Sequence, residues 1–336
     1  MAPSRANIQD FDSVYQSDAN FRYPRDVVNE ITKSRERLGG KLFFDRLLDE
    51  IEIDGQDVPQ ILSNGIAYIS TGKKVYPPQT NVELRKLYKT IIASDVPEHV
   101  KQTIVFYLLS DLEVIPGKDA ASQFVQDCFL PNKLITFVEG IHSLDRSHFE
   151  PAMENLTSPS LAPKYTSEIL AALLYAGKGK LALAYYQTVS PSLEDHDLLV
   201  QYFTMIAEGS VTEAFYFIRT QRPSMQCALL QILIERTCRG TPDEGIELVD
   251  LPFTQKEEAD FEHFLLRDIH GRNCPHAADM VMMRRISTGK FAQAKEDYRT
   301  LNLSKTPRND ITWSNIMDGL EKGLGPRNAT DIYEHD

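Results

Sequence analysis

The stretch SVTEAFYFIR, residues 210–219, decides the fold class, because its composition favours a β-strand whereas the residues at its start indicate a helix. Its aromatic residues, valine and isoleucine would suit a strand. However, Gly209 and Ser210 are typical of a helix stop followed by an N-cap, and Glu213 stands three residues after Ser210, as in a capping box that satisfies two backbone donors. We therefore predict a short aromatic helix, and the question is what it packs against.

The same pattern recurs along the second half of the chain. Four alanines each follow a large apolar residue at minus three and a small helix-ending residue at minus five. The alanines are Ala152, Ala184, Ala214 and Ala294, after Phe149, Leu181, Val211 and Phe291, and after Ser147, Gly179, Gly209 and Gly289. The first three alanines are 32 and 30 residues apart. The last follows after 80, which leaves room for two further units or for one unit with an insertion. This spacing is typical of a helix-turn-helix repeat.

A longer apolar stretch precedes three of the glycines, at residues 165–176, 198–207 and 277–286, so each unit is predicted to be two antiparallel helices. The small alanine allows a close approach between them. The predicted buried stripe against the unit's own first helix consists of Val211, Ala214, Phe215 and Ile218. Phe217 is expected to face the next unit, and Tyr216 the polar side. The predicted fold class is all-α, an irregular α-solenoid of antiparallel helix pairs with almost no strand.

Three regions are predicted along the chain. Residues 1–24 form a polar lead-in that is partly disordered, residues 25–302 a helical-repeat domain, and residues 303–336 a C-terminal helix with a frayed tail. Inside the domain an irregular connector follows the helix at 42–51. It ends in VYPP, residues 75–78, because proline cannot continue a helix, and the next helix begins near Thr80.

Composition narrows the class of protein. The chain has 336 residues, 42% hydrophobic and 25% charged, as in an ordinary globular protein. The formal net charge of -12 has the wrong sign for holding nucleic acid through its phosphates. No secretory signal and no stretch approaching 18 apolar residues is found, so a soluble intracellular chain without membrane insertion is expected. The scattered cysteines favour free thiols in or near the core.

Two clusters could suggest chemistry, and both have a simpler interpretation. Glu194-Asp195-His196-Asp197 contains the HD dipeptide of some metal phosphohydrolases, but acids at this point favour a helix start. A second cluster has zinc-capable atoms but does not match ligand spacing: His263, His270, Cys274 and His276. No GxxxxGK[ST], GxGxxG, GxSxG or HExxH occurs. We expect no enzyme, no catalytic residue, no cofactor and no metal.

Several segments, in this order, resemble the helical domain of ELYS-type nucleoporins, particularly the short fungal forms. They are LFFDRLLDEIEI, VYPP, IVFYLLSDLE, HSLDRSHFEPAMENL, GKLALAYYQ, GSVTEAFYFIR and LPFTQKEEADFEHFLL, within residues 38–300. The most specific are SVTEAFYFIR at 210–219 and LVDLPFTQKEE at 248–258, with Asp145 of HSLD in the position that the family pattern expects.

The resemblance implies a structural scaffold in the Y-shaped outer-ring complex of the nuclear pore, at the nuclear envelope. The implied partners, at the short arm of the Y, are a large propeller-plus-solenoid nucleoporin and a small β-propeller one. It further implies a part in pore assembly and nucleocytoplasmic transport. Animal members carry a propeller and a tail with AT-hooks; this sequence has no RGRP core, so no direct DNA binding is expected. The alternative is a helical-repeat adaptor of another complex, in trafficking or degradation, and a helical metal hydrolase stands third.

Partner contacts are expected off the buried stripes. On the repeat helix these are Tyr216 with the neighbouring Arg219 and Arg222, since tyrosine and arginine often dominate interfaces. In the connector, Tyr76 would be presented by the prolines that follow it. The N-terminal aromatic residues Phe11 to Tyr23 come next. The alternative for both tyrosines is ordinary packing between helices.

Overall fold

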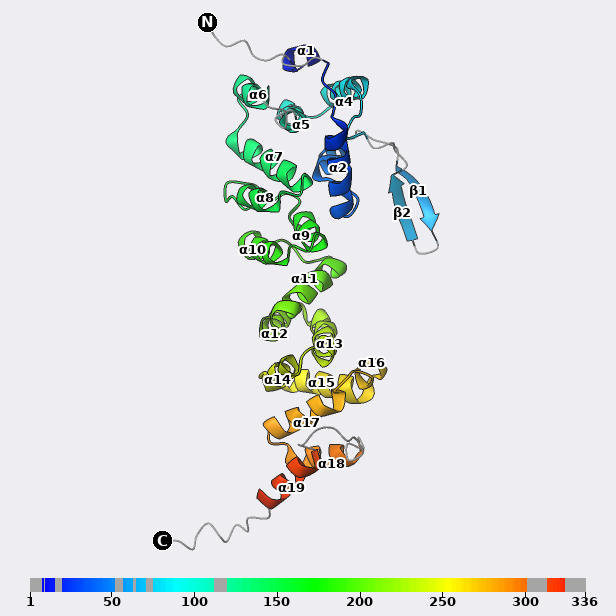
Figure 1. Cartoon of the computed structure of the whole chain (residues 1–336), viewed down its shortest axis with the longest axis vertical. Coiled ribbons are helices and arrows are strands. Elements are labelled where there is room, and N and C mark those ends of the chain that lie inside the picture. Colours follow the sequence, from blue (N-terminus) through cyan, green and yellow to red (C-terminus); the bar gives the residue numbers. More distant parts are fainter. Residues whose placement is uncertain are drawn as a thin grey trace, which may run out of the picture. The chain divides into compact units, whose positions relative to one another are not determined.

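The computed structural model describes residues 8, 10–15, 20–51, 57–62, 65–70, 75–111, 120–300 and 313–323, with the backbone alone for 57–62, 65–70, 314, 320 and 321. Parts of the predicted lead-in and tail, residues 1–24 and 303–336, therefore lie outside the described residues. The chain forms two compact units, Met1–Glu194 (unit 1) and Asp195–Asp336 (unit 2). Nearly every described element in each is a helix (Figure 1), so the predicted all-α class is confirmed.

Unit 1 contains ten helices and one hairpin among its described residues. They are α1 Phe11–Val14, α2 Arg25–Arg37, α3 Phe43–Glu50, β1 Asp57–Leu62, β2 Gly65–Ser70, α4 Asn81–Ala93, α5 Glu98–Ser110, α6 Ala120–Cys128, α7 Asn132–Asp145, α8 Phe149–Leu156, α9 Thr166–Tyr175 and α10 Gly179–Val189. Neighbouring helices pack as pairs, α7 with α8 and α9 with α10, and α8 also contacts α10. The repeat therefore stacks pair on pair within this unit.

The strands β1 and β2 are a feature that sequence analysis missed. They pair antiparallel from Asp57 opposite Ser70 to Leu62 opposite Gly65. The connector was predicted to be irregular, and that detail was wrong. The prediction of almost no strand holds, because this hairpin is the only pair of strands among the described residues. The signal was present in the sequence: Asn64-Gly65 between two apolar runs is a strong hairpin indication.

The described N-terminal residues pack on unit 1 and do not project from it. Phe11 stacks on Tyr15 with ring centroids 4.3 Å apart, and both rings meet the edge of Tyr88 on α4. Arg85 of α4 lies over the Phe11 ring and binds Asp12. The N-terminal aromatic residues are thus buried within the chain, which removes them as candidates for a partner contact.

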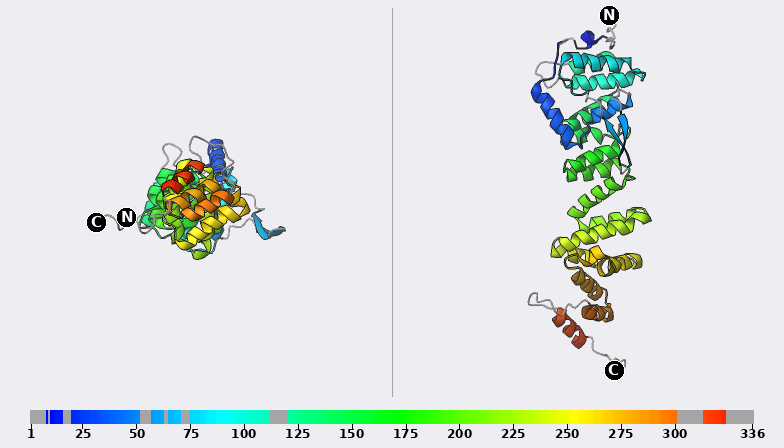
Figure 2. Two further views of the ribbon diagram at one scale, coloured as in Figure 1. Left: turned by 90° about the horizontal axis from the view of Figure 1, so that it is seen from below. Right: turned by 90° about the vertical axis from the view of Figure 1, so that its right-hand side faces the viewer.

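Unit 2 contains nine helices among its described residues (Figure 2, right). They are α11 His196–Gly209, α12 Val211–Thr220, α13 Pro223–Arg239, α14 Pro242–Asp250, α15 Gln255–Arg267, α16 Ile269–Arg272, α17 Ala277–Ser287, α18 Phe291–Thr300 and α19 Trp313–Gly323. The pairs α11–α12, α13–α14 and α17–α18 continue the pattern of unit 1.

The register of the repeat differs from the prediction in α10. Four alanines, each the fourth residue of the second helix in its pair, are fully buried: Ala152, Ala182, Ala214 and Ala294. In α10 this residue is Ala182, and the predicted Ala184 is exposed. The helix stop is Gly177, while Gly179 begins α10. The prediction was wrong by two residues because GKGKLALA offers two glycines and two alanines at the same spacing.

Three of the stops share one backbone geometry. Ser147, Gly177 and Gly289 have φ of 61°, 69° and 72°. The residue after each donates its N–H to the carbonyl five residues back, as in the Schellman motif: His148 to Ser143, Lys178 to Leu173 and Lys290 to Arg285, at 2.8, 2.9 and 2.7 Å. The second helix then begins two residues after the stop, so the stop fixes the position of the buried alanine.

The gap between Ala214 and Ala294 holds one further pair and an insertion. Gly245 is the fourth residue of α14, is buried, and follows Ala214 by 31 residues, so it takes the place of the alanine. Ala294 comes 49 residues later, because α15 and α16 lie between α14 and the pair α17–α18. Of the two arrangements left open by the sequence, the structure has the second.

The quoted helix 210–219 is α12, and its predicted contacts hold in part. Ser210 Oγ accepts from Glu213 N at 3.1 Å, but Ser210 N donates to Ile206 O, since Ser210 also ends α11. The stripe Val211, Ala214, Phe215 and Ile218 is buried as predicted. The Phe217 ring instead lies against Tyr202 and Phe203 of α11, and the Phe215 ring meets Phe253 beyond α14. The two phenylalanines have therefore exchanged their predicted roles.

Among the described residues, no helix combines the length and apolar character needed to cross a membrane.

Candidate partner interface

A fully buried carboxylate, Asp111 at the end of α5, joins distant segments of unit 1. Tyr23 and Tyr76 donate their hydroxyls to its Oδ2 atom at 2.6 and 2.8 Å. Its Oδ1 atom lies 2.7 Å from Arg146 Nη2 and 3.0 Å from His142 Nε2. The N-terminal segment, the connector and the end of α7 therefore converge on one side chain.

A second buried carboxylate, Asp145 at the end of α7, caps another helix. Its two oxygens accept the N–H groups of Phe43 and Phe44 at 2.8 and 2.9 Å, which are orphan donors of the first turn of α3. Tyr107 of α5 donates its hydroxyl to Oδ2 at 2.9 Å. Asp145 thus takes the role of an N-cap for α3 from a hundred residues away in sequence.

The pKa values of the two carboxylates are shifted in opposite directions. Burial by itself would raise the pKa of Asp111, but the hydrogen bond and charge of His142 and the charge of Arg146 hold that pKa below its ordinary value. Burial raises the pKa of Asp145 to about 7, against the lowering effect of the Phe43, Phe44 and Tyr107 bonds. Asp111 is therefore a permanent charge, whereas Asp145 takes up a proton near neutral pH.

The structure buries Tyr76 in this network, leaving 1% of the residue exposed. Its hydroxyl binds Asp111, its carbonyl accepts from Arg35 at 2.8 Å, and its ring packs against Phe44 at 4.5 Å. The prediction that the connector presents Tyr76 to a partner was wrong, because hydrogen bonds to Asp111 and Arg35 hold the residue in the interior. Tyr76 of VYPP, Asp111 of SDLE and Asp145 of HSLD thus lie in the interior of unit 1.

Arg219 of α12 has a comparable role in unit 2. It forms two hydrogen bonds to Glu257 of α15, at 2.9 and 2.8 Å, and a third to the carbonyl of Pro252 at 2.7 Å. Glu257 also accepts from Thr254 N and completes the predicted capping box of α15. The two segments expected to be most specific, 210–219 and 248–258, therefore meet through Arg219 and Glu257, and through Phe215 and Phe253.

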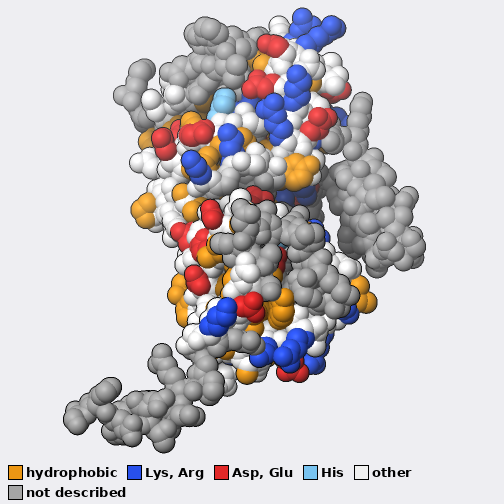
Figure 3. All heavy atoms as spheres, turned by 60° about the horizontal axis from the view of Figure 1, so that its bottom comes forward, with side chains coloured by type: hydrophobic (Ala, Val, Ile, Leu, Met, Phe, Trp, Pro, Cys, Tyr) orange, Lys and Arg blue, Asp and Glu red, His pale blue; other side chains and the backbone are white. Residues whose placement is uncertain are grey.

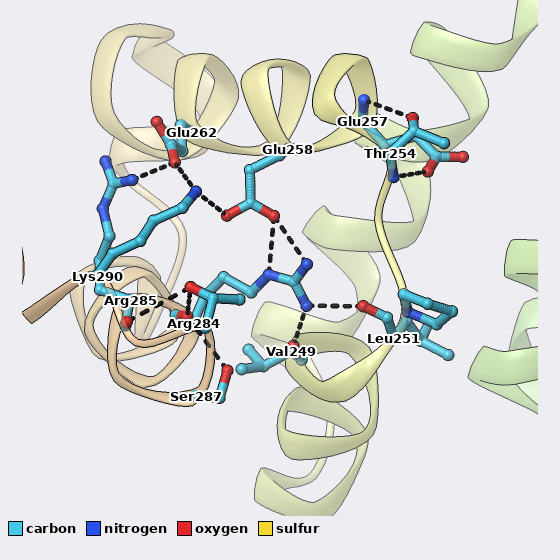
Figure 4. Close-up of polar contacts among 12 residues, drawn as sticks. Val249, Leu251, Thr254, Glu257, Glu258, Glu262, Arg284, Arg285, Ser287 and Lys290 are labelled. Carbon is cyan, nitrogen blue, oxygen red and sulfur yellow. Dashed lines mark hydrogen bonds and ion pairs between the residues drawn. The ribbon is translucent and has the colours of Figure 1, made fainter.

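Two arginines of α17 bind acidic side chains of α15, the longer of the two inserted helices (Figure 4). Arg284 binds Glu258 of α15 at 2.9 Å and donates to the carbonyl of Leu251 at 2.7 Å. Arg285 binds Glu262, one turn further along α15. Both arginine side chains are at least nine-tenths buried, so α17 is fixed to α15 and to the end of α14.

Tyr216 is different, because it faces solvent. It is 48% exposed, with the Arg219 guanidinium 5.7 Å from its ring centroid. It is the sixth residue of its helix, and the sixth residue is exposed in all five second helices: Glu154, Ala184, Tyr216, Glu247 and Glu296. Tyr216 is the one aromatic residue at a position that is otherwise acidic or small. Its predicted orientation is confirmed.

Arg222 and a small hollow complete this region. Arg222 is the exposed N-cap residue of α13. A hollow of about 200 Å³ beside Arg219 has Ile218 and Leu230 among its apolar lining residues and Lys256 and Asp260 among its charged ones. On the face drawn in Figure 3, acidic and basic side chains are mixed. The structure thus brings Tyr216 and Arg219 together on α12 and separates them from Tyr76, which lies inside unit 1.

The first of the two clusters with possible chemistry has a structural role. Asp195 is the N-cap of α11 and accepts from the N–H groups of Asp197 and Leu198, which confirms the helix start. Among the described residues no group of three or more histidine, cysteine, aspartate or glutamate side chains is arranged to hold a metal ion. The four cysteines are free thiols, and Cys238 and Cys274 are buried.

Helix pairs in register, joined by buried polar ties, define a helical-repeat protein of the scaffold class. The sequence model of the ELYS family, described as nuclear pore complex assembly, matches residues 41–268. The chain belongs to this family. Membership of the family places the chain at the nuclear pore complex.

Three relatives agree with this assignment. The chain is 26% identical to the uncharacterized protein ely5 of Schizosaccharomyces pombe over 242 residues, 71% of this chain and 74% of that protein. It is 25% identical to Protein ELYS of Xenopus laevis over 263 residues and 24% identical to Protein ELYS of Homo sapiens over 313 residues. These matches cover 73% and 87% of this chain but span only 10% and 13% of the two vertebrate proteins.

Proposed function

We propose that the chain is a non-enzymatic scaffold nucleoporin that binds the short arm of the Y-shaped nuclear pore subcomplex. The partners proposed are the large propeller-plus-solenoid nucleoporin and the small β-propeller nucleoporin of that arm. The observation that carries the proposal is the family match across residues 41–268, which includes helix pairs of both units. Through this contact the chain supports pore assembly and nucleocytoplasmic transport.

The internal ties support a scaffold role. Asp111 and Asp145 in unit 1, and Arg219 and Arg284 in unit 2, use their polar groups to hold helices of the same chain. Residues that fix helices in this way leave the exposed faces of the pairs for contacts with other proteins. With a formal net charge of -12, such contacts are proposed with proteins and not with DNA.

The proposal is tested by mixing the purified full chain with the purified short-arm nucleoporins and following complex formation by size-exclusion chromatography and calorimetry. Affinity purification from cells at mild salt is a second, independent test, which identifies the proteins bound to the chain. We expect a stoichiometric complex and recovery of outer-ring nucleoporins. Recovery of a trafficking or degradation complex instead would assign the chain to an adaptor role and overturn the proposal.

Within the proposal, Tyr216, Arg219 and Arg222 are the contact residues on the chain. Tyr216→Ala is the clean variant, because the side chain is 48% exposed. Arg222→Ala is compared with its own melting temperature, because Arg222 is exposed but has an interaction within the chain. Arg219→Ala also removes three internal hydrogen bonds, so its melting temperature must be measured beside its binding. Tyr175→Ala is the matched control, since Tyr175 is 65% exposed and lies in unit 1.

A further inference from the structure

We infer that the outer face of α12 and α14 binds a lysine- or arginine-bearing segment of a partner nucleoporin. The acidic-aromatic face, as we name it, consists of Glu213, Tyr216, Asp243, Ile246, Glu247 and Asp250. The inference rests on the proposed function for the identity of the partner. The chemistry of the partner segment, however, follows from this face alone.

The two helices lie side by side and run in the same direction. Thr212, the second residue of α12, donates its N–H and its hydroxyl to Glu247, the sixth residue of α14, at 3.0 and 2.6 Å. Near their ends Arg219 of α12 donates to the carbonyl of Pro252, two residues past α14. Tyr216 lies one turn after Thr212, and Asp250 lies nearly one turn after Glu247, so both belong to the same stretch of surface.

Two apolar side chains on this face are exposed where the repeat does not require it. Tyr216 and Ile246 are each 48% exposed. The residues equivalent to Tyr216 are acidic or small, as shown above. The residues equivalent to Ile246, the fifth of the second helix, include Met153 and Phe215, which are buried. Two departures from the repeat pattern on adjacent helices indicate a surface used for contact.

Apart from Arg219, whose guanidinium lies 5.7 Å from the Tyr216 ring centroid, the charged side chains of α12 and α14 are acidic. Glu213, Asp243, Glu247 and Asp250 are all exposed, and α14 contains no lysine or arginine. Arg219 on α12 is paired with Glu257, so its charge is already balanced. Four exposed carboxylates, a tyrosine and an isoleucine on two adjacent helices suit a partner segment that combines cations with apolar surface, because a cation stacks on a tyrosine ring and pairs with acids.

The test measures the affinity of full-chain variants for the purified short-arm nucleoporins at two salt concentrations. Tyr216→Ala should weaken binding about tenfold, as loss of a central aromatic contact does. Asp250→Lys should weaken binding and reduce its salt dependence, while a cation at the end of α14 favours the helix. The matched controls are Tyr175→Ala, at an exposed tyrosine in unit 1, and Glu296→Lys, at an exposed acid of α18 in the repeat position of Tyr216. Both should bind within about twofold of wild type.

Normal binding by Tyr216→Ala and Asp250→Lys, with wild-type binding intact, overturns the inference and leaves the proposed function standing. If the wild type binds no short-arm nucleoporin, the proposed function fails. A photo-crosslinking phenylalanine derivative in place of Tyr216, with the same derivative in place of Glu154 as control, then decides on the face itself. A cross-link in cells to a peptide with an excess of lysine and arginine supports it. An acidic peptide, or no cross-link above the control, rejects it.

Discussion

The two units bury charge in different ways. In unit 1 two carboxylates, Asp111 and Asp145, are buried together with arginines such as Arg146, and the donors come to the carboxylates from four or more segments. In unit 2 the buried groups are arginines, Arg284 and Arg285, which reach carboxylates and helix-end carbonyls. An arginine can lose one of several partners and keep the rest. A carboxylate at the centre of a network cannot be removed without stranding its donors, so unit 1 has the more vulnerable interior.

The largest expected effect follows from breaking the centre of unit 1. Asp111→Asn removes the buried anion 2.7 Å from the Arg146 guanidinium and leaves it only the half-exposed Glu30 at 3.7 Å, so we expect unit 1 to lose about 3–5 kcal/mol of its free energy of unfolding. Denaturant unfolding measures the loss. In unit 2, Glu258→Gln leaves Arg284 its bonds to carbonyls and should cost less. Equal losses in both variants would contradict the comparison.

The pH dependence of unit 1 is the second expected effect. Native Asp145 holds its proton up to a pKa of about 7, whereas the unfolded chain releases it near the ordinary value of 3.8. Between these values unfolding releases a proton, so the Asp145 contribution to stability falls as pH rises, by at most about 1.4 kcal/mol per pH unit. The stability of wild type relative to Asp145→Asn should therefore decline from about pH 4 to about pH 7. A relative stability that rises with pH would show that the folded state prefers the carboxylate.

Overpacking one helix pair should have a smaller effect. Ala214 is fully buried between α12 and its neighbours, so Ala214→Leu should cost about 1–3 kcal/mol, seen as a lower melting temperature. Ala184→Leu is the control, because Ala184 lies two residues past the buried position of α10 and is exposed. An unchanged melting temperature in Ala214→Leu would remove the alanine from the helix contact.

The smallest effect is a gain. Gly245 takes the alanine position in α14, and an added Cβ would meet no atom within 4 Å. Gly245→Ala should therefore stabilise unit 2 by about 0.5–1 kcal/mol through helix propensity. In unit 1, Gly140→Ala should do the reverse, because its Cβ would lie 2.7 Å from Leu156 Cγ. Destabilisation by both substitutions would mean that the α14 site is tighter than its contacts indicate.

The sequence predicted the helix pairs because their signals are local. Gly209, Ser210 and Ala214 lie within one turn of chain and need no knowledge of distant residues. In α10 the local signal was ambiguous, and only the positive φ of Gly177 distinguishes the true stop from Gly179.

Only part of the candidate site was predicted correctly from the sequence. The direction of Tyr216 follows from the helical period, and it is correct. Tyr76 was misplaced because the residue that buries it, Asp111, lies 35 positions away, and nothing near VYPP indicates that partner. The acidic-aromatic face was missed for a similar reason: the acids of α14 come beside α12 only when the two helices pack together, as Glu247 does at Thr212.

The polar centre of unit 1 also has a consequence for the order in which the chain acquires its structure. Phe43 N–H binds Asp145, 102 residues later, and Ser34 binds Ser147, 113 residues later. A nascent chain that ends before residue 145 therefore lacks one partner of each contact. The ties of unit 2 span less, 33 to 38 residues for Arg219. Chains rich in distant contacts fold slowly, since long loops must close first. On the ribosome, α2 and α3 should therefore remain open to chaperones until the end of α7 has emerged, whereas α12 can dock soon after α15 is made.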